Sequence, residues 1–488
     1  MVPRTERPRP SVPRLPQESR HRTARDSRSG REPPGAVVMA RSAPAPSAVR
    51  DQSPGLKKTL TTPLLYFFIL GDVLGAGVYV LVGQVAAKSG GAVWLPLVLA
   101  LVLSLLTAAS YAELATKYPR AGGASHYATL AYGPFAGFLA GFCMLAAGIV
   151  SVAALARGFA GEYLTAFVTL PVVLVAAVFL CALALLNARG ISESTRANVA
   201  ATVIEVGGLL LVVGLGIMLF LRGDGDAARL VQFGTADSGA AAGVLAGTVL
   251  AYYSFVGFET SVNVAEETRD PRRSYPRALF GALVTAGLVY ALVGIVASAA
   301  VPTGTLAHSS GPLLEVVKEA GGMPPELFSA IALVAVANGA LLTGIMSSRL
   351  AYGMARDGLL PRVLTRVLPG RGTPWASIAA TTVLSFLLAL TGDVETLAST
   401  LVLLLLVVFF LVNTAVLVLR RDRATHAHFR AWTALPVLGA VSCVVLATQV
   451  EAEVWVRGLI VLAVGTALGA VAAGRHRRGV AGGGIKPG

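Results

Sequence analysis

The chain has 488 residues, of which 55% are hydrophobic and only 14% are charged. Together with a mean hydropathy of +0.70, this composition excludes an ordinary water-soluble protein and indicates an integral membrane protein. The net charge of +14 is a feature that nucleic-acid-binding proteins share, but the positions of the basic residues explain it differently.

Twelve apolar stretches are long enough to cross a bilayer, which takes about 20 residues in a helix. They lie at residues 64–87, 92–116, 133–161, 170–187, 197–222, 240–265, 277–301, 325–353, 375–391, 394–419, 431–450 and 453–473. The sequence lacks the alternating segments of about ten residues that are typical of a membrane β-barrel. We therefore predict an all-α integral membrane protein with twelve transmembrane helices.

The basic residues predict the orientation of these spans, because Lys and Arg are retained on the cytoplasmic side of short loops. With both termini inside, 34 of the 40 Lys and Arg lie on the inner side. The membrane thus accounts for the net charge, and no nucleic-acid partner is expected. We predict a multi-pass protein of the plasma membrane with cytoplasmic N- and C-termini.

The segment before the first span, residues 1–58, is rich in Arg, Pro and Ser and has no apolar periodicity. This composition is typical of disordered segments, so we expect a disordered, basic cytoplasmic tail. Met39 lies within it, and an alternative is a start at Met39, with residues 1–38 untranslated.

Residues that could carry metal or cofactor chemistry are sparse in the spans. Cys143, Cys181 and Cys443 are far apart, and all six histidines lie in tails or loops. We expect no metal site, no cofactor and no membrane-embedded enzyme, which would need such groups at depth. A channel stays open as an alternative, although twelve dissimilar helices differ from the repeated elements of most pores.

The first span, LLYFFILGDVLGAGVYVLVGQVA at residues 65–87, carries Asp72 and a Gly-Ala-Gly in its middle. Secondary transporters bind substrate where two helices in corresponding positions of an inverted repeat are interrupted. The sixth span has the matching feature, with Gly257 and Glu259 at its centre. An offset of five spans, an odd number, makes the repeat inverted. The alternative is that the glycines only permit close helix packing.

These positions predict a five-plus-five inverted repeat with discontinuous first and sixth helices and two accessory helices. The expected divisions are 1–58 for the tail, 59–222 for the first repeat, 223–419 for the second, 420–473 for the accessory helices and 474–488 for a cytoplasmic tail.

Four segments carry a family resemblance. They are GDVLGAGVYVLVG, SYAELATKYPRAGGASHY, YYSFVGFETSVNVAEETRDPRRSYPRAL and SSRLAYGMARDGLLPRVLTRVLPGRGTPW. They resemble the amino acid/polyamine/organocation permeases, especially the bacterial branch that is similar to cationic amino acid transporters. The resemblance covers about residues 59–419. It implies alternating access and uptake of an amino acid or related amine, usually driven by protons.

The break in the first span predicts a site for the substrate carboxylate. At Gly75, Ala76 and Gly77, free backbone N–H groups would lie at the positive end of the outer half-helix. Glycine suits this place because a ligand must approach the backbone closely.

The break in the sixth span predicts a site for the substrate ammonium group. The resemblance, and the need to satisfy backbone groups in lipid, imply that carbonyls around Tyr253, Ser254 and Phe255 accept its hydrogen bonds beside Gly257. Phe255 and Phe258 are candidates to close over the substrate. The alternative, weighed above all for Phe258, is packing against neighbouring helices.

Acids within the spans are candidates for coupling or gating. Glu259 lies where a charge costs about 2.5 to 3.5 kcal/mol, and either it holds the unwound segment or it contacts the substrate. The resemblance places Glu205 where much of the family has a lysine linked to proton coupling. Asp72, Ser347 and Ser348 would face the same region.

We therefore predict a secondary active transporter of an amino acid or related amine, with proton-coupled symport preferred. Protons are preferred over sodium as the coupling ion because the family mostly uses protons. Exchange, sodium coupling and a structural role for Glu205 are the alternatives. A membrane sensor that binds amino acids without transport is the alternative from another class, and the sequence does not identify the substrate.

Overall fold

The computed structural model describes residues 61–119, 122–190, 194–234, 239–422, 424 and 426–482. The predicted tail at residues 1–58 and the alternative start at Met39 lie outside the described residues. At the other end, helix α17 continues to Gly482, beyond residue 473, where the sequence predicts that the last span ends.

The described residues form helices and no β-strand, apart from one isolated bridge between Gly90 and Phe233. The α-helices are α1 (Thr62–Val73), α2 (Gly77–Ser89), α3 (Trp94–Lys117), α4 (Gly123–Tyr132), α5 (Pro134–Phe159), α6 (Glu162–Thr165), α7 (Val172–Arg189), α8 (Ser194–Arg222), α9 (Ala240–Tyr253), α10 (Pro271–Ala300), α11 (Thr303–His308), α12 (Pro312–Ala320), α13 (Pro325–Arg356), α14 (Trp375–Thr391), α15 (Val394–Leu419), α16 (Ala434–Ala447) and α17 (Ala452–Gly482). Short 3₁₀-helices are η1 (Ala227–Val231), η2 (Phe258–Glu267) and η3 (Arg362–Thr365).

Within the described part of the chain, nine helical segments are long and apolar enough to cross a membrane. A tenth span is counted if α1 and α2, bent by 48° at their junction, cross together. Two shorter apolar helices, α14 and α16, lie at the remaining predicted positions. The all-helical, multi-pass class is thus confirmed, whereas the count of twelve spans stays a prediction.

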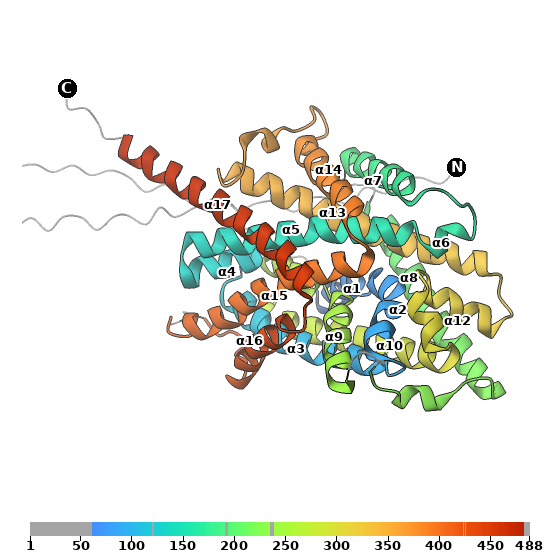
Figure 1. The fold of residues 1–488 in the computed structure, drawn as a ribbon. Helices are drawn as coiled ribbons and strands as arrows, with labels where there is room; N and C mark the ends of the chain where they lie inside the picture. Colours follow the sequence, from blue (N-terminus) through green and yellow to red (C-terminus); the bar gives the residue numbers. More distant parts are fainter. Residues whose placement is uncertain are drawn as a thin grey trace, which may run out of the picture. The chain divides into compact units, whose positions relative to one another are not determined.

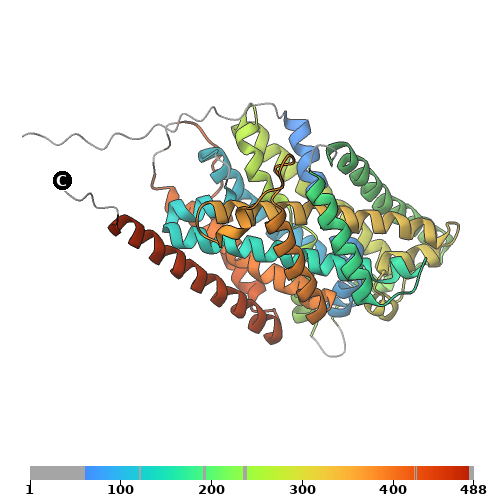
Figure 2. The same ribbon diagram turned by 90° about the horizontal axis from the view of Figure 1, so that it is seen from above.

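Helix α5 runs through the middle of the helix assembly, with α13 and α15 packed along it (Figure 1). Helix α10 packs along α3 and α1, and α2 packs along α9. Helix α17 lies against α5 and α15 at the edge of the helix assembly in both views (Figure 2). These contacts surround the two interrupted helices with continuous ones.

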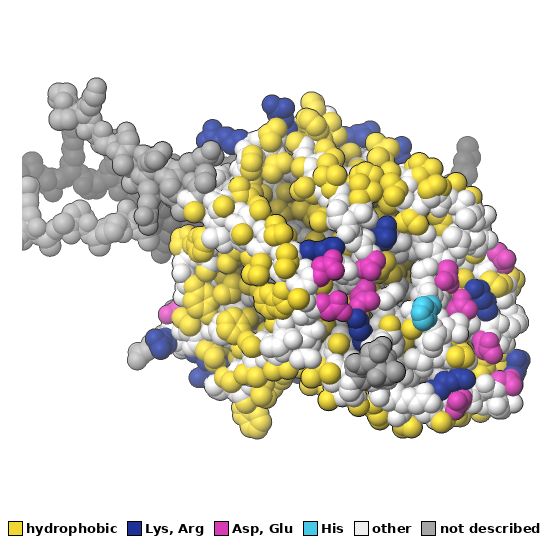
Figure 3. All heavy atoms as spheres, viewed as in Figure 1, with side chains coloured by type: hydrophobic (Ala, Val, Ile, Leu, Met, Phe, Trp, Pro, Cys, Tyr) yellow, Lys and Arg dark blue, Asp and Glu magenta, His cyan; other side chains and the backbone are white. Residues whose placement is uncertain are grey.

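Small residues permit the close approach of α3 and α10. A Cβ atom on Gly294 would lie 2.8 Å from Leu97 Cδ1 and 3.2 Å from the backbone of Trp94. Small residues of this kind are enriched where membrane helices meet, because lipid supplies little hydrophobic force for helix association. Large apolar side chains lie on much of the outer surface instead, where acyl chains would contact them (Figure 3).

A buried ion pair joins α3 to the end of α15. Arg420 donates from Nε to Oε1 of Glu113 at 2.8 Å and from Nη2 to Oε2 at 2.6 Å. The same carboxylate accepts the backbone N–H of Ala431 at 2.9 Å, and Glu113 is only 1% exposed. This geometry satisfies both charges and attaches the segment before α16 to the helix core.

Candidate functional site

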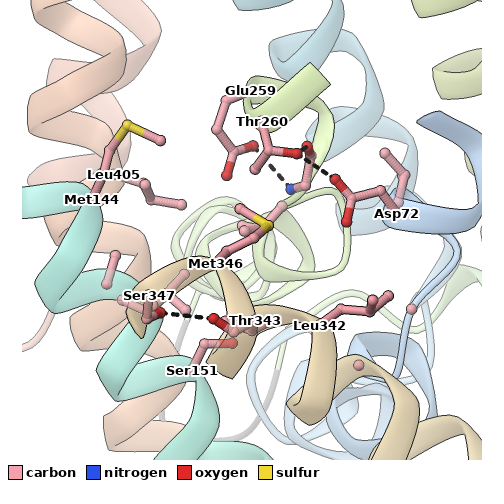
Figure 4. A pocket seen from close by; sticks show the side chains of 18 of the residues that line it. Asp72, Met144, Ser151, Glu259, Thr260, Leu342, Thr343, Met346, Ser347 and Leu405 are labelled. Carbon is pink, nitrogen blue, oxygen red and sulfur yellow. Dashed lines mark hydrogen bonds between the residues drawn. The ribbon is translucent and has the colours of Figure 1, made fainter. Parts of the chain in front are cut away.

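The interrupted helices meet at a cavity of about 440 Å³. It is lined by residues of α1, α2, α4, α5, α8, α9, η2, α13 and α15 (Figure 4). Of the predicted site residues, ten line it: Asp72, Gly75, Ala76, Gly77, Glu205, Tyr253, Ser254, Gly257, Glu259 and Ser347. Segments far apart in the sequence are therefore brought to one place.

The interrupted segments of the two helices contact each other at glycine residues. Gly257 has φ +129°, and a Cβ atom there would lie 2.6 Å from the carbonyl oxygen of Asp72. A Cβ atom on Gly77 would lie 3.0 Å from Ser254 Cα. Close backbone approach and the left-handed conformation of Gly257 both require the absence of a side chain. The glycines therefore mark real interruptions and also permit the breaks to cross.

The α1–α2 break exposes the start of a helix to the cavity. Helix α1 ends at Val73, the N–H of Gly75 donates to the carbonyl of Val73 at 2.7 Å, and α2 begins at Gly77. No side chain caps α2 at Ala76. The first N–H groups of a helix have no partner within it, and the helix dipole makes that end positive. This end of the cavity suits an anion.

The α9–η2 break is held by polar contacts that reach back to α1. Helix α9 ends at Tyr253, and the N–H of Gly257 donates to Oε2 of Glu259 at 2.9 Å. The hydroxyl of Thr260 lies 2.5 Å from Oδ2 of Asp72 and 2.8 Å from the carbonyl of Gly257. Glu259 thus holds the unwound segment, and Thr260 links the two breaks.

Glu205 lies deep in α8, with none of its side chain exposed to solvent. Neither carboxylate oxygen has a hydrogen bond of standard geometry. The side chain of Asn338 on α13 is close enough to interact with the carboxylate, but it does not complete such a bond. Tyr79 donates from its hydroxyl to the backbone carbonyl of Glu205 at 2.6 Å, which connects this position to α2.

The two serines of α13 lie in different surroundings. Ser347 lines the cavity and donates to the carbonyl of Thr343 at 2.8 Å. Ser348 is turned away and accepts a hydrogen bond from Nδ2 of Asn187 at 3.1 Å. Only Ser347 therefore lies where the sequence expectation places both serines, and its hydroxyl is bonded within its own helix.

The two candidate gating aromatics are packed outside the cavity lining. Phe255 is fully buried, with its ring centroid 5.3 Å from that of Tyr290. Phe258 is also fully buried, 5.5 Å from Phe409 and 5.7 Å from Tyr111. In this conformation both rings pack against neighbouring helices, which is the alternative that the sequence analysis left open.

Comparison with known proteins agrees with this architecture. The model of a family described as amino acid permease matches residues 60–466. The chain belongs to the amino acid permease family. The resemblance to amino acid/polyamine/organocation permeases noted from the four sequence segments is thereby confirmed, and the members of this family are transporters, not enzymes.

Several relatives of the permease carry transporter names. Cationic amino acid transporter 4 of Mus musculus is 31% identical over 76% of this chain and 61% of its own length. An uncharacterized transporter of Mycobacterium tuberculosis is 31% identical over 82% of this chain and 87% of its own. The branched-chain amino acid permease of Bacillus subtilis is 25% identical over 80% and 86%. The permease thus spans less than two thirds of the mouse transporter.

The cavity of the permease extends toward one end of the helices. Gly122, Gly123, Asn263 and Arg349 line it there, and these are residues that the basic-residue count assigns to the cytoplasmic side. The middle of α2 is packed closely against α11, since a Cβ atom on Gly83 would lie 2.4 Å from the carbonyl oxygen of Leu306.

Several residues of the site were not named from the sequence, and three of them are polar groups close to the predicted acids. Thr260 and Asn338 line the cavity, and Tyr79 bonds the backbone of Glu205. Asn338 is a polar residue in the middle of the span at 325–353, a signal that could have identified it. Among the residues with assigned positions, no group of three or more His, Cys, Asp and Glu could hold a metal ion.

Proposed function

We propose that the permease is a secondary active transporter that carries an amino acid or related amine across the plasma membrane by alternating access. The observation that supports this most directly is the meeting of two interrupted helices at a cavity of about 440 Å³. Binding sites for small molecules usually have volumes of about 300 to 1,000 Å³. The transporter names of the relatives agree with this proposal.

The substrate lies between the two breaks in this proposal. Its carboxylate is bound at the uncapped start of α2, at Gly75, Ala76 and Gly77, where the helix dipole favours a negative charge. Its ammonium group is bound at the end of α9, where a helix terminus leaves carbonyl groups at Ser254 and Phe255 without helical partners. Backbone groups of opposite polarity then bind the two charges that all α-amino acids share.

Transport is coupled to protons through Glu205, in symport. The carboxyl group faces the cavity region but has no hydrogen bond of standard geometry, and an isolated charge inside a bilayer is costly. Glu205 therefore takes up a proton from the outer solution while the cavity is open to that side, stays neutral while the cavity is closed, and releases the proton when water enters from the cytoplasmic side. Exchange or sodium coupling at Asp72 and Ser347 is the second candidate, because both also line the cavity.

The conformation agrees with an inward-facing state. The cavity reaches residues assigned to the cytoplasmic side, among them Arg349, while close packing of α2 against α11 obstructs the other side. With cytoplasmic termini, opening of the outer side requires α2 to separate from Leu306. The inverted five-plus-five repeat supplies the two related halves for this exchange.

Reconstitution into liposomes tests the proposed function. The purified protein is offered radiolabelled amino acids and amines, with and without inward proton and sodium gradients. We expect accumulation that depends on the proton gradient and collapses with a protonophore. Saturable binding without any passage into the lumen would contradict transport and favour a sensor.

A further inference from the structure

We propose that the substrate is a neutral amino acid with an apolar side chain of about the size of leucine or methionine, and that it is neither lysine, arginine nor a polyamine. This inference rests on the proposed function, because it assigns the side-chain chamber of the same cavity. It is based on the side chains that the continuous helices contribute to the cavity wall.

One part of the wall contributed by the continuous helices is apolar, although Ser151 on α5 and Asn338, Thr343 and Ser347 on α13 also line the cavity. Met144 lies on α5, Met346 on α13, and Leu401 and Leu405 on α15, and all four line the cavity. Figure 4 shows Met144 and Leu405 on one side of the cavity and Asp72 on the opposite side, with Met346 between them. A substrate whose charged groups lie at the breaks would extend its side chain among these residues.

The acids of the cavity do not offer a partner for a cationic side chain. Asp72 accepts from the hydroxyl of Thr260, and Glu259 accepts from the N–H of Gly257, so both carboxylates are bound to the broken segment of η2. Glu205, on α8, has no hydrogen bond of standard geometry, but in the proposed function it carries the coupling proton, and a protonated carboxyl group does not neutralise a substrate cation. None of the four apolar wall residues is a carboxylate, and a lysine ammonium group placed among them would lose its hydration without a partner.

Charge at the cytoplasmic end of the cavity also disfavours a cationic substrate. Arg349 lines the cavity and donates from Nη1 to the carbonyl of Ile345 on its own helix at 3.1 Å. No carboxylate pairs with it among the residues whose positions are described. Its positive charge repels a cation and attracts the carboxylate of an amino acid.

Methionine side chains suit this role because they are flexible and adapt to unbranched or branched apolar groups. Truncation of one of them enlarges the chamber without adding charge. Met144→Ala should therefore weaken selection for leucine and methionine and admit a larger apolar side chain such as phenylalanine. Met218 on α8 does not line the cavity, so Met218→Ala is the matched control.

The experiment measures uptake of leucine, methionine, phenylalanine, lysine, arginine and putrescine by wild type and both variants in liposomes. We expect kcat/KM for leucine or methionine to exceed that for lysine at least tenfold. Met144→Ala should lower kcat/KM for leucine or methionine by about tenfold or more, since one methylene in an apolar pocket is worth about 10- to 200-fold. Met218→Ala should leave this kcat/KM unchanged.

Each contrary result has a different meaning. Preferential uptake of lysine, arginine or putrescine overturns this inference and leaves the proposed transporter function intact. If the protein prefers leucine and neither Met144→Ala nor Met218→Ala changes that preference, the assignment of the side-chain chamber to Met144 is wrong. Passage of none of these compounds, with folded protein inserted in the liposomes, overturns both the inference and the proposed function.

Discussion

Replacement of Glu205 by glutamine tests proton coupling with the least structural change. Glutamine has nearly the same shape but cannot release a proton. The carboxylate oxygens have no hydrogen bond of standard geometry to lose, and Tyr79 bonds the backbone carbonyl, not the side chain. We therefore expect Glu205→Gln to fold and insert like the wild type.

The expected loss follows from the energy that one proton supplies. A membrane potential of 100 mV contributes about 2.3 kcal/mol for each charge moved. Because about 1.4 kcal/mol corresponds to a tenfold ratio, symport of one proton with a neutral amino acid supports roughly fiftyfold accumulation. Glu205→Gln should abolish this accumulation and leave counterflow exchange of substrate, which needs no net proton movement.

The assay is radiolabelled uptake into liposomes with an imposed inward proton gradient and a defined membrane potential. Glu326→Gln is a matched control, because Glu326 is an exposed acid in the first turn of α13. It should accumulate substrate like the wild type. Uphill accumulation by Glu205→Gln equal to that of the wild type would refute the coupling role and leave Glu205 a structural group.

Three further variants test other parts of the structure. Gly257→Ala places a Cβ atom 2.6 Å from a backbone oxygen at φ +129°, which costs about 1 to 3 kcal/mol of strain, so the melting temperature in detergent and the uptake should both fall. The control variant Gly353→Ala should change neither, because a Cβ atom there has nothing within 4 Å. Equal behaviour of the two variants would contradict the close crossing of the two breaks. Glu113→Ala leaves Arg420 without its buried partner, which should cost about 3 to 5 kcal/mol and lower the melting temperature in detergent, and an unchanged melting temperature would show that the pair contributes nothing. A chain that begins at Met39 should transport like the full chain, and reduced uptake per inserted molecule would assign a role to the tail.

Several features of this protein follow from local sequence properties. Apolar stretches of membrane-spanning length predict the helical, multi-pass class without reference to partners. Gly75, Gly77 and Gly257 predict the breaks, because glycine among apolar residues marks places where the backbone departs from a helix or approaches another chain segment. The structure interrupts both helices at these glycines, and the family assignment agrees with the same motifs.

Only the tertiary structure decided in which direction individual side chains point. Helical periodicity places residues on faces of a continuous helix, but it does not apply where α9 unwinds into η2. Phe255 and Phe258 therefore pack among aromatic rings, whereas Thr260 reaches Asp72, 188 positions away in the chain. Ser348 likewise turns to Asn187 on α7. Which side chains line the cavity depends on how helices distant in sequence rotate against one another, and no local pattern specifies that rotation.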